Sequence, residues 1–199
     1  MNARTILLGA ALLTSAVTAG EEKTTLAHPD ILFVLIDSIK ASHLGCYGYG
    51  RDTTPNNDRF AKAECVRFET VIPGGSWTIP AVMTLFTSLP ADEHRRVMPN
   101  LPHDGKAVTF AETLRGAGYA TVGITAKGMV SHRFGYGKGF DLWDDYSATL
   151  PPEAGLLKAA SGYAKGMALT KMGLNRLKRR DPAKPLFLFL FYMDPHWDF

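Results

Sequence analysis

The sequence predicts an α/β protein in which helices flank a largely parallel central sheet. Three short stretches rich in apolar residues have the length of strands: Ile31–Ile36, Tyr119–Ala126 and Pro185–Met193. Short runs that are apolar on both faces are typical of strands buried on both sides in a parallel sheet. Stretches with helical spacing, such as Val108–Gly116, separate them, and alternating strands and helices are typical of the α/β class.

Composition and charge narrow the class of partner. The chain has 199 residues, of which 46% are hydrophobic and 21% charged, and these values are ordinary for a globular domain. The formal net charge is only +3, and the sequence has no arm rich in Lys and Arg with interleaved aromatic residues. We therefore expect no nucleic-acid partner, whereas a mild positive charge suits an anionic substrate.

We expect a secretory signal peptide over residues 1–19 and a polar leader over residues 20–28. Met1–Arg4 carries one positive charge, Thr5–Ala16 is an apolar run too short to span a bilayer, and Val17–Ala19 offers small residues for cleavage. An uncleaved anchor or a buried first helix is the alternative. A signal peptide implies an exported protein, periplasmic or secreted, and the rest of the sequence has no candidate for a stable membrane span.

Export would place Cys46 and Cys65 in an oxidising compartment, where they could form a disulfide. One pair of cysteines is not a disulfide framework. We favour two small buried thiols, because free cysteine commonly behaves as a core hydrophobe.

Asp37 directly follows the first apolar run, so it lies at the carboxyl end of a predicted strand. In open α/β sheets ligands bind at this edge, where a carboxylate can hold a hard cation. The alternative role for Asp37 is to cap the following loop.

Thr78 lies at or just before the N-terminus of a predicted helix, because Pro80 suits a first helical turn and apolar residues continue through Phe86. Unpaired backbone N–H groups and a partial positive charge at that end suit a sulfate or phosphate group, and also a hydroxyl nucleophile activated as an alkoxide. The alternative is that Thr78 is simply the N-cap residue, the commoner role of a threonine in this position.

Lys127 and His196 follow the other two apolar stretches and are expected at the same edge as Asp37. Lys127 comes after Tyr119–Ala126, and His196 follows Pro185–Met193 and a turn fixed by Pro195. A histidine there can act as a general acid for a leaving group. A structural histidine and a solvated loop lysine are the alternatives.

Other segments are expected to be architectural. Thr54-Pro55 opens a helix with Phe60 and Ala63 on its apolar face, and the alternation of Val66–Ile72 predicts a strand. His94 is expected to be a solvated or hydrogen-bonded loop histidine.

After Pro151-Pro152 a basic amphipathic helix is predicted, either lying on a membrane or partner or, as we favour, packing on the sheet with a solvated basic face. Its apolar residues recur at helical spacing: Leu156, Ala160, Tyr163, Met167, Leu174, Leu177.

The motifs together resemble the N-terminal half of a sulfatase-type enzyme of the alkaline phosphatase superfamily, over residues 29–199. The matching segments are Pro29-Asp30-Ile31-Leu32 through Asp37, His43–Tyr49, Thr54-Pro55-Asn56 with Asp58-Arg59-Phe60, Val66-Arg67-Phe68, Thr78-x-Pro80 with Leu85-x-Thr87-x-Leu89-Pro90, and Asp194-Pro195-His196.

The resemblance implies an alkaline phosphatase-like fold and a metal-dependent hydrolase of small-molecule or glycan sulfate or phosphate esters. Thr78 would be the nucleophile and, with Asp37, a metal ligand; Lys127 would contact the sulfate group, and His196 would belong to the active site. The divalent metal implied is calcium, or zinc or manganese on a branch that cleaves phosphate esters. The oligomeric state does not follow from the resemblance.

The sequence also departs from the family pattern. Formylglycine sulfatases carry Cys or Ser followed by x-Pro-x-Arg, whereas this chain has Thr78, Pro80 and Val82, and the family's paired aspartates are reduced to Asp37-Ser38. The pattern is closer to the branch with an unmodified threonine nucleophile. A phosphodiesterase or phosphoethanolamine-type transferase and an inactive remnant are therefore alternative functions.

Sulfatase-like enzymes are typically about twice as long as this chain, so we expect a catalytic half, from a fragment or a truncated reading frame, with an incomplete metal site. We also expect the last predicted strand, Pro185–Met193, to lack a neighbour on one side and expose an apolar edge.

Overall fold

The computed structural model describes residues 28–63, 65–98, 105–145 and 166–196. The predicted signal peptide, residues 20–27 of the leader and the first part of the predicted basic helix, residues 156–165, lie outside the described residues. None of the helices within the described ranges is long and apolar enough to cross a membrane.

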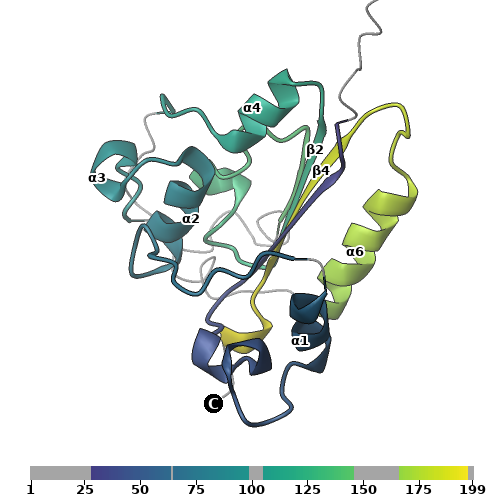
Figure 1. Ribbon diagram of the computed structural model, residues 1–199. Helices are drawn as coiled ribbons and strands as arrows, with labels where there is room; N and C mark the ends of the chain where they lie inside the picture. The colour runs from purple at the N-terminus through teal and green to yellow at the C-terminus, as the bar shows by residue number, and fades with distance from the viewer. Residues whose placement is uncertain (1–27, 64, 99–104, 146–165, 197–199) are drawn as a thin grey trace, which may run out of the picture.

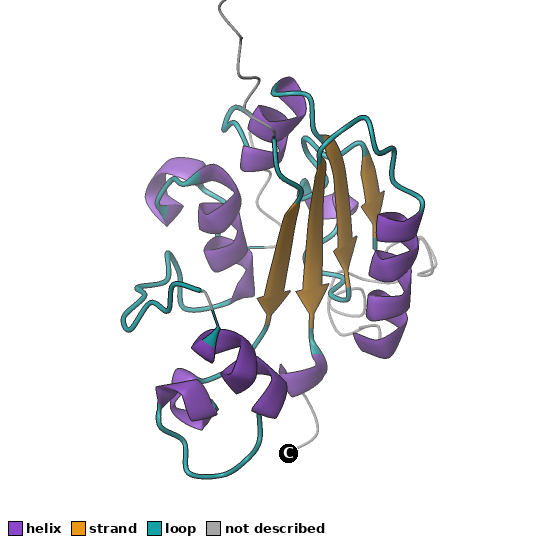
Figure 2. Ribbon diagram, turned by 45° about the vertical axis from the view of Figure 1, so that its right-hand side comes forward, coloured by secondary structure: helices purple, strands orange, loops and turns teal. Residues whose placement is uncertain are grey.

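A four-stranded parallel sheet forms the centre of the molecule (Figure 2). The strands follow the spatial order β1-β4-β2-β3, with bounds Ile31–Ile36 for β1, Leu186–Tyr192 for β4, Ala120–Thr125 for β2 and Leu142–Asp144 for β3. The predicted α/β class and the three predicted strands are confirmed. The three-residue strand β3 was not predicted, because its short sequence has no apolar run.

The last strand is interior, so our expectation of an open edge at β4 was wrong. Ile31 of β1 pairs with Phe187, and Thr121 of β2 pairs with the same residue on the other side. Among the described strands, the edge next to β4 is β1. The order differs because a sequence shows where strands occur but not which strands are neighbours.

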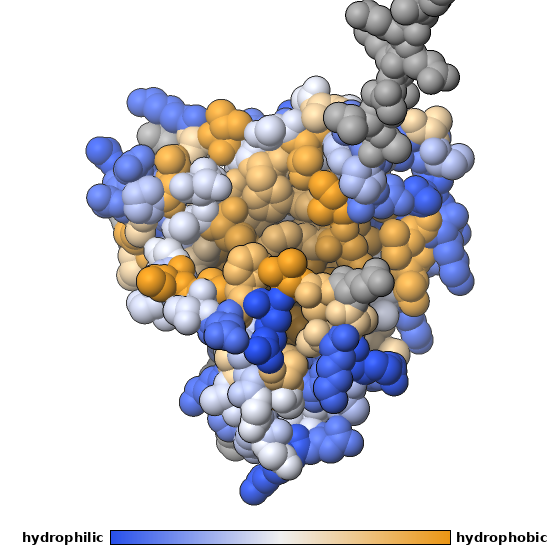
Figure 3. Space-filling model, viewed as in Figure 1, coloured by the Kyte–Doolittle hydropathy of each residue, from blue (hydrophilic) through white to orange (hydrophobic). Residues whose placement is uncertain are grey.

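β1 is also less buried than its apolar sequence predicts. Phe33 and Leu35 pack against the core, whereas Leu32 and Val34 on the other face are 55% and 47% exposed. Figure 3 shows an apolar surface in the middle of this view of the molecule. Burial on both sides was therefore wrong for β1, because among the described helices α6 contacts β2 and β4 instead.

Helices cover both faces of the sheet (Figures 1 and 2). α2 (Thr78–Thr87) and α4 (Phe110–Gly116) lie on one face, with α3 (Ala91–His94) packed on α2. α6 (Gly166–Lys178) lies on the other face, where Leu169 and Gly173 are buried. The helix therefore packs on the sheet as we favoured, over its described part, but the predicted packing face was wrong at Met167 and Leu174, which are 71% and 50% exposed.

A smaller group of elements lies beyond the carboxyl ends of the strands (Figure 1). It contains α1 (Pro55–Lys62) and the short 3₁₀ turns η1 (Ala41–His43) and η2 (Gly45–Tyr47). Two further 3₁₀ turns, η3 (His132–Phe134) and η5 (Asp194–His196), follow β2 and β4. η1 and η5 therefore begin at the edge where the sequence predicts the site.

Two local predictions in this part of the chain were wrong. Residues 66–72 form no strand, and Val66 and Ile72 are 80% and 88% exposed. Phe60 on α1 is also exposed rather than packed. Alternation produces a strand only where a neighbouring strand accepts it, and this segment runs over the surface.

Aromatic rings fill the core between the sheet and the helices on the α2 face. Phe86 of α2 is buried and meets five aromatic side chains at ring-centroid distances of 4.9 to 6.4 Å, namely Phe110, Tyr136, Phe140, Trp143 and Phe189. Most of these contacts are edge-to-face, an arrangement that aromatic quadrupoles favour. This packing fixes α2, and with it Thr78, against the sheet.

Candidate active site

Asp37 and Thr78 meet at the carboxyl edge of the sheet. The Asp37 N–H donates to the Tyr192 carbonyl at 3.0 Å, which extends the β1–β4 ladder by one residue and fixes the start of the loop. The Thr78 hydroxyl donates to Asp37 Oδ2 at 3.1 Å. Two residues that are 41 positions apart in the chain thus form a direct hydroxyl–carboxylate pair.

Thr78 is the first residue of α2 and not its cap. Trp77 occupies the N-cap position in an extended conformation and makes no side-chain cap hydrogen bond. The Thr78 hydroxyl is bonded to Asp37 instead of to the backbone of its own helix. The N-cap alternative for Thr78 is therefore contradicted, and its oxygen lies at the positive end of a ten-residue helix.

Ser38 adopts a left-handed backbone conformation, with φ of +61°, directly after Asp37. This conformation is strained for a residue other than glycine, and such backbone strain is found most often at functional sites. Its hydroxyl donates to Asp37 Oδ1 at 3.1 Å. The two carboxylate oxygens of Asp37 therefore accept from two different hydroxyls.

Lys127 is a buried lysine close to Asp37. It follows β2, and its residue surface is only 4% exposed. Burial lowers the pKa of Lys127, and the negative charge of Asp37 partly opposes this shift. Because Lys127 is buried rather than solvated, the solvated-loop alternative is contradicted.

His196 ends η5, where its N–H donates to the Met193 carbonyl at 2.9 Å. Asp194, two residues earlier, accepts from the Gly166 N–H at 2.9 Å and so holds the start of α6 rather than facing the site. The half-buried ring of His196 lines the same cavity as Asp37 and Thr78.

That cavity, here called the catalytic cavity, has a volume of about 610 Å³. Asp37, Thr78 and His196 all line it, together with Ser76 and Trp77 just before α2, whereas Lys127 is not among its lining residues. Within the described ranges no group of three His, Cys, Asp or Glu side chains is placed to hold a metal ion. The cavity thus combines a hydroxyl, a carboxylate and an imidazole, the groups needed for acyl-type or sulfuryl transfer to a side chain.

The family model described as Sulfatase matches residues 29–199. The chain belongs to the sulfatase family. An N-acetylglucosamine-6-O-sulfatase of Bacteroides thetaiotaomicron is 28% identical over 204 residues, which cover 98% of this chain and 36% of that protein. The sulfatase chain described here therefore spans about a third of the length of this curated relative.

Solved structures confirm the alkaline phosphatase-like fold. A protein in complex with its substrate D-glucosamine-2-N,6-O-disulfate is similar with a TM-score of 0.69 and 23% identity, covering 84% of this chain and 35% of that one. The phosphonate monoester hydrolase of Agrobacterium radiobacter is similar with a TM-score of 0.65 and 17% identity, covering 85% and 42% of the two chains. At these identities the likeness shows the fold of the sulfatase chain.

A buried polar network supports the N-terminus of α2 in this sulfatase. The Tyr136 hydroxyl donates to the carbonyl of Ile79, the second residue of α2, at 2.9 Å. Burial raises the pKa of Tyr136, against an opposing effect of the nearby Arg96 guanidinium, which hydrogen-bonds to the tyrosine. Tyr136 therefore remains a neutral donor throughout the ordinary pH range, 57 residues away in sequence from the carbonyl it holds.

His94 belongs to the same network and is buried at the end of α3. Its Nε2 is 3.0 Å from the Thr84 hydroxyl of α2, and its Nδ1 accepts from the Arg96 N–H at 2.9 Å. Of the two expectations for His94, the hydrogen-bonded one is confirmed. His94 therefore ties α3 to α2 away from the catalytic cavity.

Tyr136→Phe is expected to lower the free energy of unfolding by about 1–3 kcal/mol, because it removes a buried donor and leaves the Ile79 carbonyl and Arg96 each with one partner fewer. Urea denaturation measures the loss. Tyr47→Phe is the matched control, since its hydroxyl donates to the Phe68 carbonyl in a half-exposed position, and we expect a change within about 0.5 kcal/mol. Equal losses in the two variants would contradict the role given to Tyr136.

The prediction that both cysteines are buried thiols was wrong. Both are free thiols, but Cys65 is exposed and Cys46 is half-buried. The backbone N–H of Cys46 donates a hydrogen bond to Asp58 Oδ1 at 2.7 Å.

Proposed function

We propose that this protein is a metal-dependent hydrolase of sulfate esters that uses Thr78 as its nucleophile. The observation that carries the proposal is the 3.1 Å hydrogen bond from the Thr78 hydroxyl to Asp37 at the end of β1. It aims the threonine proton at a carboxylate and leaves the oxygen facing a cavity. Because the chain spans about a third of its curated relative, the activity of the whole protein belongs to the proposal.

In the proposed reaction Thr78 Oγ1 attacks the sulfur of the ester. The proton of the hydroxyl leaves along its hydrogen bond towards Asp37 Oδ2, an O–S bond forms to Thr78, and the bond from sulfur to the alcohol oxygen breaks. His196, on the wall of the same cavity, donates a proton to the departing alcohol. Water then hydrolyses the threonine sulfate ester and restores the hydroxyl.

Lys127 and the N-terminus of α2 supply positive charge for the sulfuryl oxygens. The lysine is buried and close to Asp37, and backbone N–H groups at the first turn of α2 are without helical partners. Charges fixed in a partly dry site stabilise a transition state without reorganising.

The donor set at this edge suits a hard divalent cation, because Asp37 and Thr78 offer oxygen atoms. Two oxygens are fewer than the roughly six that such an ion takes, so water, substrate oxygens or residues outside the described ranges would supply the others. When bound, the cation would lower the pKa of the Thr78 hydroxyl. We propose calcium as this metal, and zinc or manganese if the substrate is a phosphate ester.

We propose a small-molecule or glycan sulfate ester as the substrate class. Support comes from the names of the similar proteins, an N-acetylglucosamine-6-O-sulfatase and a protein solved with a disulfated glucosamine. Hydrolysis of a phosphorus ester is the second candidate. Its support is the resemblance, which matches Thr78 to the Cys or Ser of formylglycine sulfatases, and the fold shared with the phosphonate monoester hydrolase.

The test uses the protein as its natural source makes it, with calcium, zinc or manganese supplied in turn. It is offered matched aryl esters of sulfate, phosphate and phosphonate, in water and with an added acceptor alcohol. Sulfate release into water supports the proposal, and faster release from the phosphorus esters replaces it with the second candidate. Transfer to the alcohol indicates a transferase, and no turnover with any ester and metal contradicts a catalytic function.

Export is the second part of the proposal. We infer that residues 1–19 are a signal peptide, from the one charged and one apolar region described above. The intact mass and N-terminal sequence of the natural protein test this inference. A mature protein that begins at Gly20 supports it, and one that keeps Met1–Ala19 contradicts it.

A further inference from the structure

The outward side of α6 carries a narrow stripe in which apolar and cationic side chains alternate. Met167, Lys171, Leu174 and Lys178 are all exposed and follow one another at intervals of four, three and four residues. At 3.6 residues per turn, these intervals place the four side chains on one face of the helix, along roughly 16 Å of its axis. This face, here called the outer stripe, lies opposite Leu169, which packs on the sheet.

Contacts with β4 and η5 fix the direction in which the outer stripe points. Gly173 is buried against Leu190 of β4, and the first carbon of a side chain at this position would lie 3.1 Å from Leu190. The Gly166 N–H donates to Asp194 of η5 at 2.9 Å. Figures 1 and 2 show α6 on the outside of the molecule, across the sheet from α2. The outer stripe is therefore held facing away from the sheet.

The charge along α6 is positive only. Residues 166–180 include five Lys or Arg and no Asp or Glu. Arg176 and Arg180 form ion pairs with aspartates outside the helix, at 4.0 and 2.6 Å. The two lysines of the outer stripe form no ion pair with any residue that the structure describes. Their charges are therefore available to an anionic partner.

The mixture of charged and apolar side chains suits an anionic bilayer better than a soluble polyanion. Lysine side chains reach lipid phosphates while their stems lie along apolar surface. Met167 and Leu174 are exposed beside the lysines, where they can enter the boundary between headgroups and acyl chains, as the apolar residues of interfacial helices do. A soluble polyanion offers these two side chains no apolar environment.

We propose that the outer stripe binds the surface of a membrane that contains anionic phospholipids. The axis of α6 lies along the membrane plane, with Lys171 and Lys178 on headgroup phosphates and with Met167 and Leu174 in the boundary region. The association is reversible, because two lysines and two apolar side chains provide less binding free energy than a permanent anchor needs.

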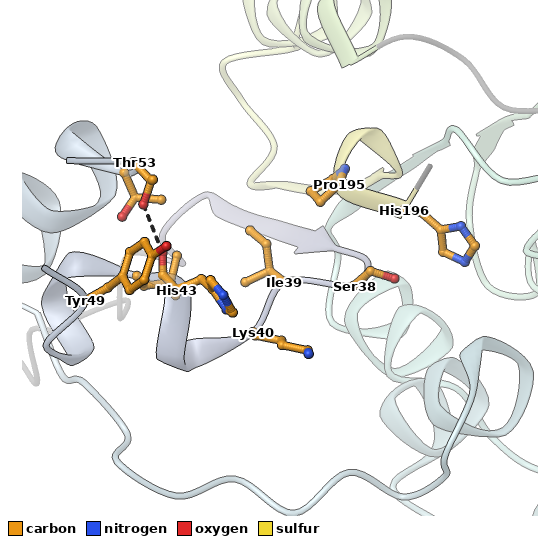
Figure 4. Close-up of a pocket in the computed structure, with 10 residues that line it drawn as sticks. Ser38, Ile39, Lys40, His43, Tyr49, Thr53, Pro195 and His196 are labelled. Atoms are coloured by element: carbon orange, nitrogen blue, oxygen red, sulfur yellow. Dashed lines mark hydrogen bonds between the residues drawn. The ribbon is translucent and has the colours of Figure 1, made fainter. Parts of the chain in front are cut away.

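This binding uses none of the residues that line the cavities at the carboxyl edge. Figure 4 shows one of these cavities, with a volume of about 660 Å³, which shares Ser38, Ile39 and His196 with the catalytic cavity. No residue of α6 lines either of the two. Substitutions on the outer stripe therefore test membrane binding without touching the proposed catalytic residues.

The test is sedimentation of the natural protein with vesicles of phosphatidylglycerol and phosphatidylcholine in equal amounts, compared with vesicles of phosphatidylcholine alone. We expect binding to the anionic vesicles to be at least about tenfold tighter, and to weaken as salt rises from about 50 to about 300 mM. Lys171→Gln and Lys178→Gln are each expected to weaken it about fivefold. Leu174→Gln is also expected to weaken it about fivefold, because the exposed half of the leucine no longer leaves water.

Lys62→Gln and Phe60→Gln on α1 are matched controls, because both residues are exposed and lie outside α6. Each is expected to bind the anionic vesicles within about twofold of the natural protein, with circular dichroism as a check on folding. The inference is overturned if the protein does not bind the anionic vesicles, if it binds neutral vesicles equally well, or if the control substitutions weaken binding as much as those on α6.

Poly-L-glutamate, a soluble polyanion, separates a membrane from an acidic protein as the partner. Leu174→Gln is expected to leave the binding of poly-L-glutamate unchanged and to weaken only the binding of vesicles. If Leu174→Gln binds the anionic vesicles as tightly as the natural protein does, charge alone is recognised and the membrane is rejected as the partner. Because no ester is present in these measurements, their failure would leave the proposed hydrolase function untouched.

Discussion

Thr78→Ala is expected to lower kcat for ester hydrolysis by about 10⁴-fold or more, while the fold is retained. The variant removes the only atom proposed to bond to sulfur, and the Ser38 hydroxyl is held on the other oxygen of Asp37 rather than at the position of Thr78 Oγ1. Steady-state kinetics of the natural protein and its variant, with circular dichroism as a check on folding, measure the effect.

Thr87→Ala is the matched control for this experiment. Thr87 lies at the other end of α2, and its hydroxyl donates to the Met83 carbonyl at 2.8 Å, away from the catalytic cavity. We expect its kcat within about twofold of the natural protein, and Thr78→Ser should retain part of the activity because it keeps the hydroxyl. Normal turnover by Thr78→Ala would show that the nucleophile lies elsewhere.

Lys127→Met is expected to lower kcat by about 10²–10³-fold, the loss typical when one fixed charge or donor is removed from a transition state. The side chain is buried beside Asp37, so its charge acts at low local dielectric. Lys171→Met on the exposed side of α6 removes a lysine of the same length and is expected to change kcat less than twofold. Equal effects of the two substitutions would exclude a role for Lys127 in the reaction.

The same lysine should set the alkaline limit of activity. Burial lowers its pKa, so the ammonium is fully charged at low pH and loses its proton as pH rises through a value below the ordinary lysine value of about 10.4. Activity should therefore fall on the alkaline side. Lys127→Arg, whose guanidinium stays charged, should keep partial activity and lose this limb of the pH profile. An alkaline limb that is unchanged in Lys127→Arg would assign the titration to another group.

Much of the site could be predicted from single strands and their ends. A short apolar run followed by a polar residue gives both the strand and the edge at which its last side chain lies, and this reasoning located Asp37, Lys127 and His196 at one edge. Parallel pairing then brings these three residues together, because the carboxyl ends of parallel strands lie at the same edge of the sheet. The Asp37–Thr78 contact follows because α2 begins at that edge.

Other features depend on contacts that no local pattern encodes. The Tyr136–Ile79 hydrogen bond joins an irregular loop to a helix, and neither residue has a spacing that indicates the other. The Val66–Ile72 prediction failed for the converse reason, since its alternation is real but none of the described strands pairs with it. The left-handed conformation of Ser38 could not be predicted from the sequence either, because serine has no preference for it.

The central position of β4 has a consequence for biosynthesis. β1 and β2 have no strand between them until Leu186–Tyr192 is made, about 60 residues after the end of β2. At ordinary translation rates of about 5–20 residues per second, that interval lasts roughly 3–12 s. During it β1 lacks its described partner strand and β2 can pair only with the short strand β3, so the emerging chain keeps apolar strand edges unpaired. On the proposal that the protein is exported, this delay becomes useful, because a chain that cannot close its sheet early stays loose enough to be threaded through a translocation channel.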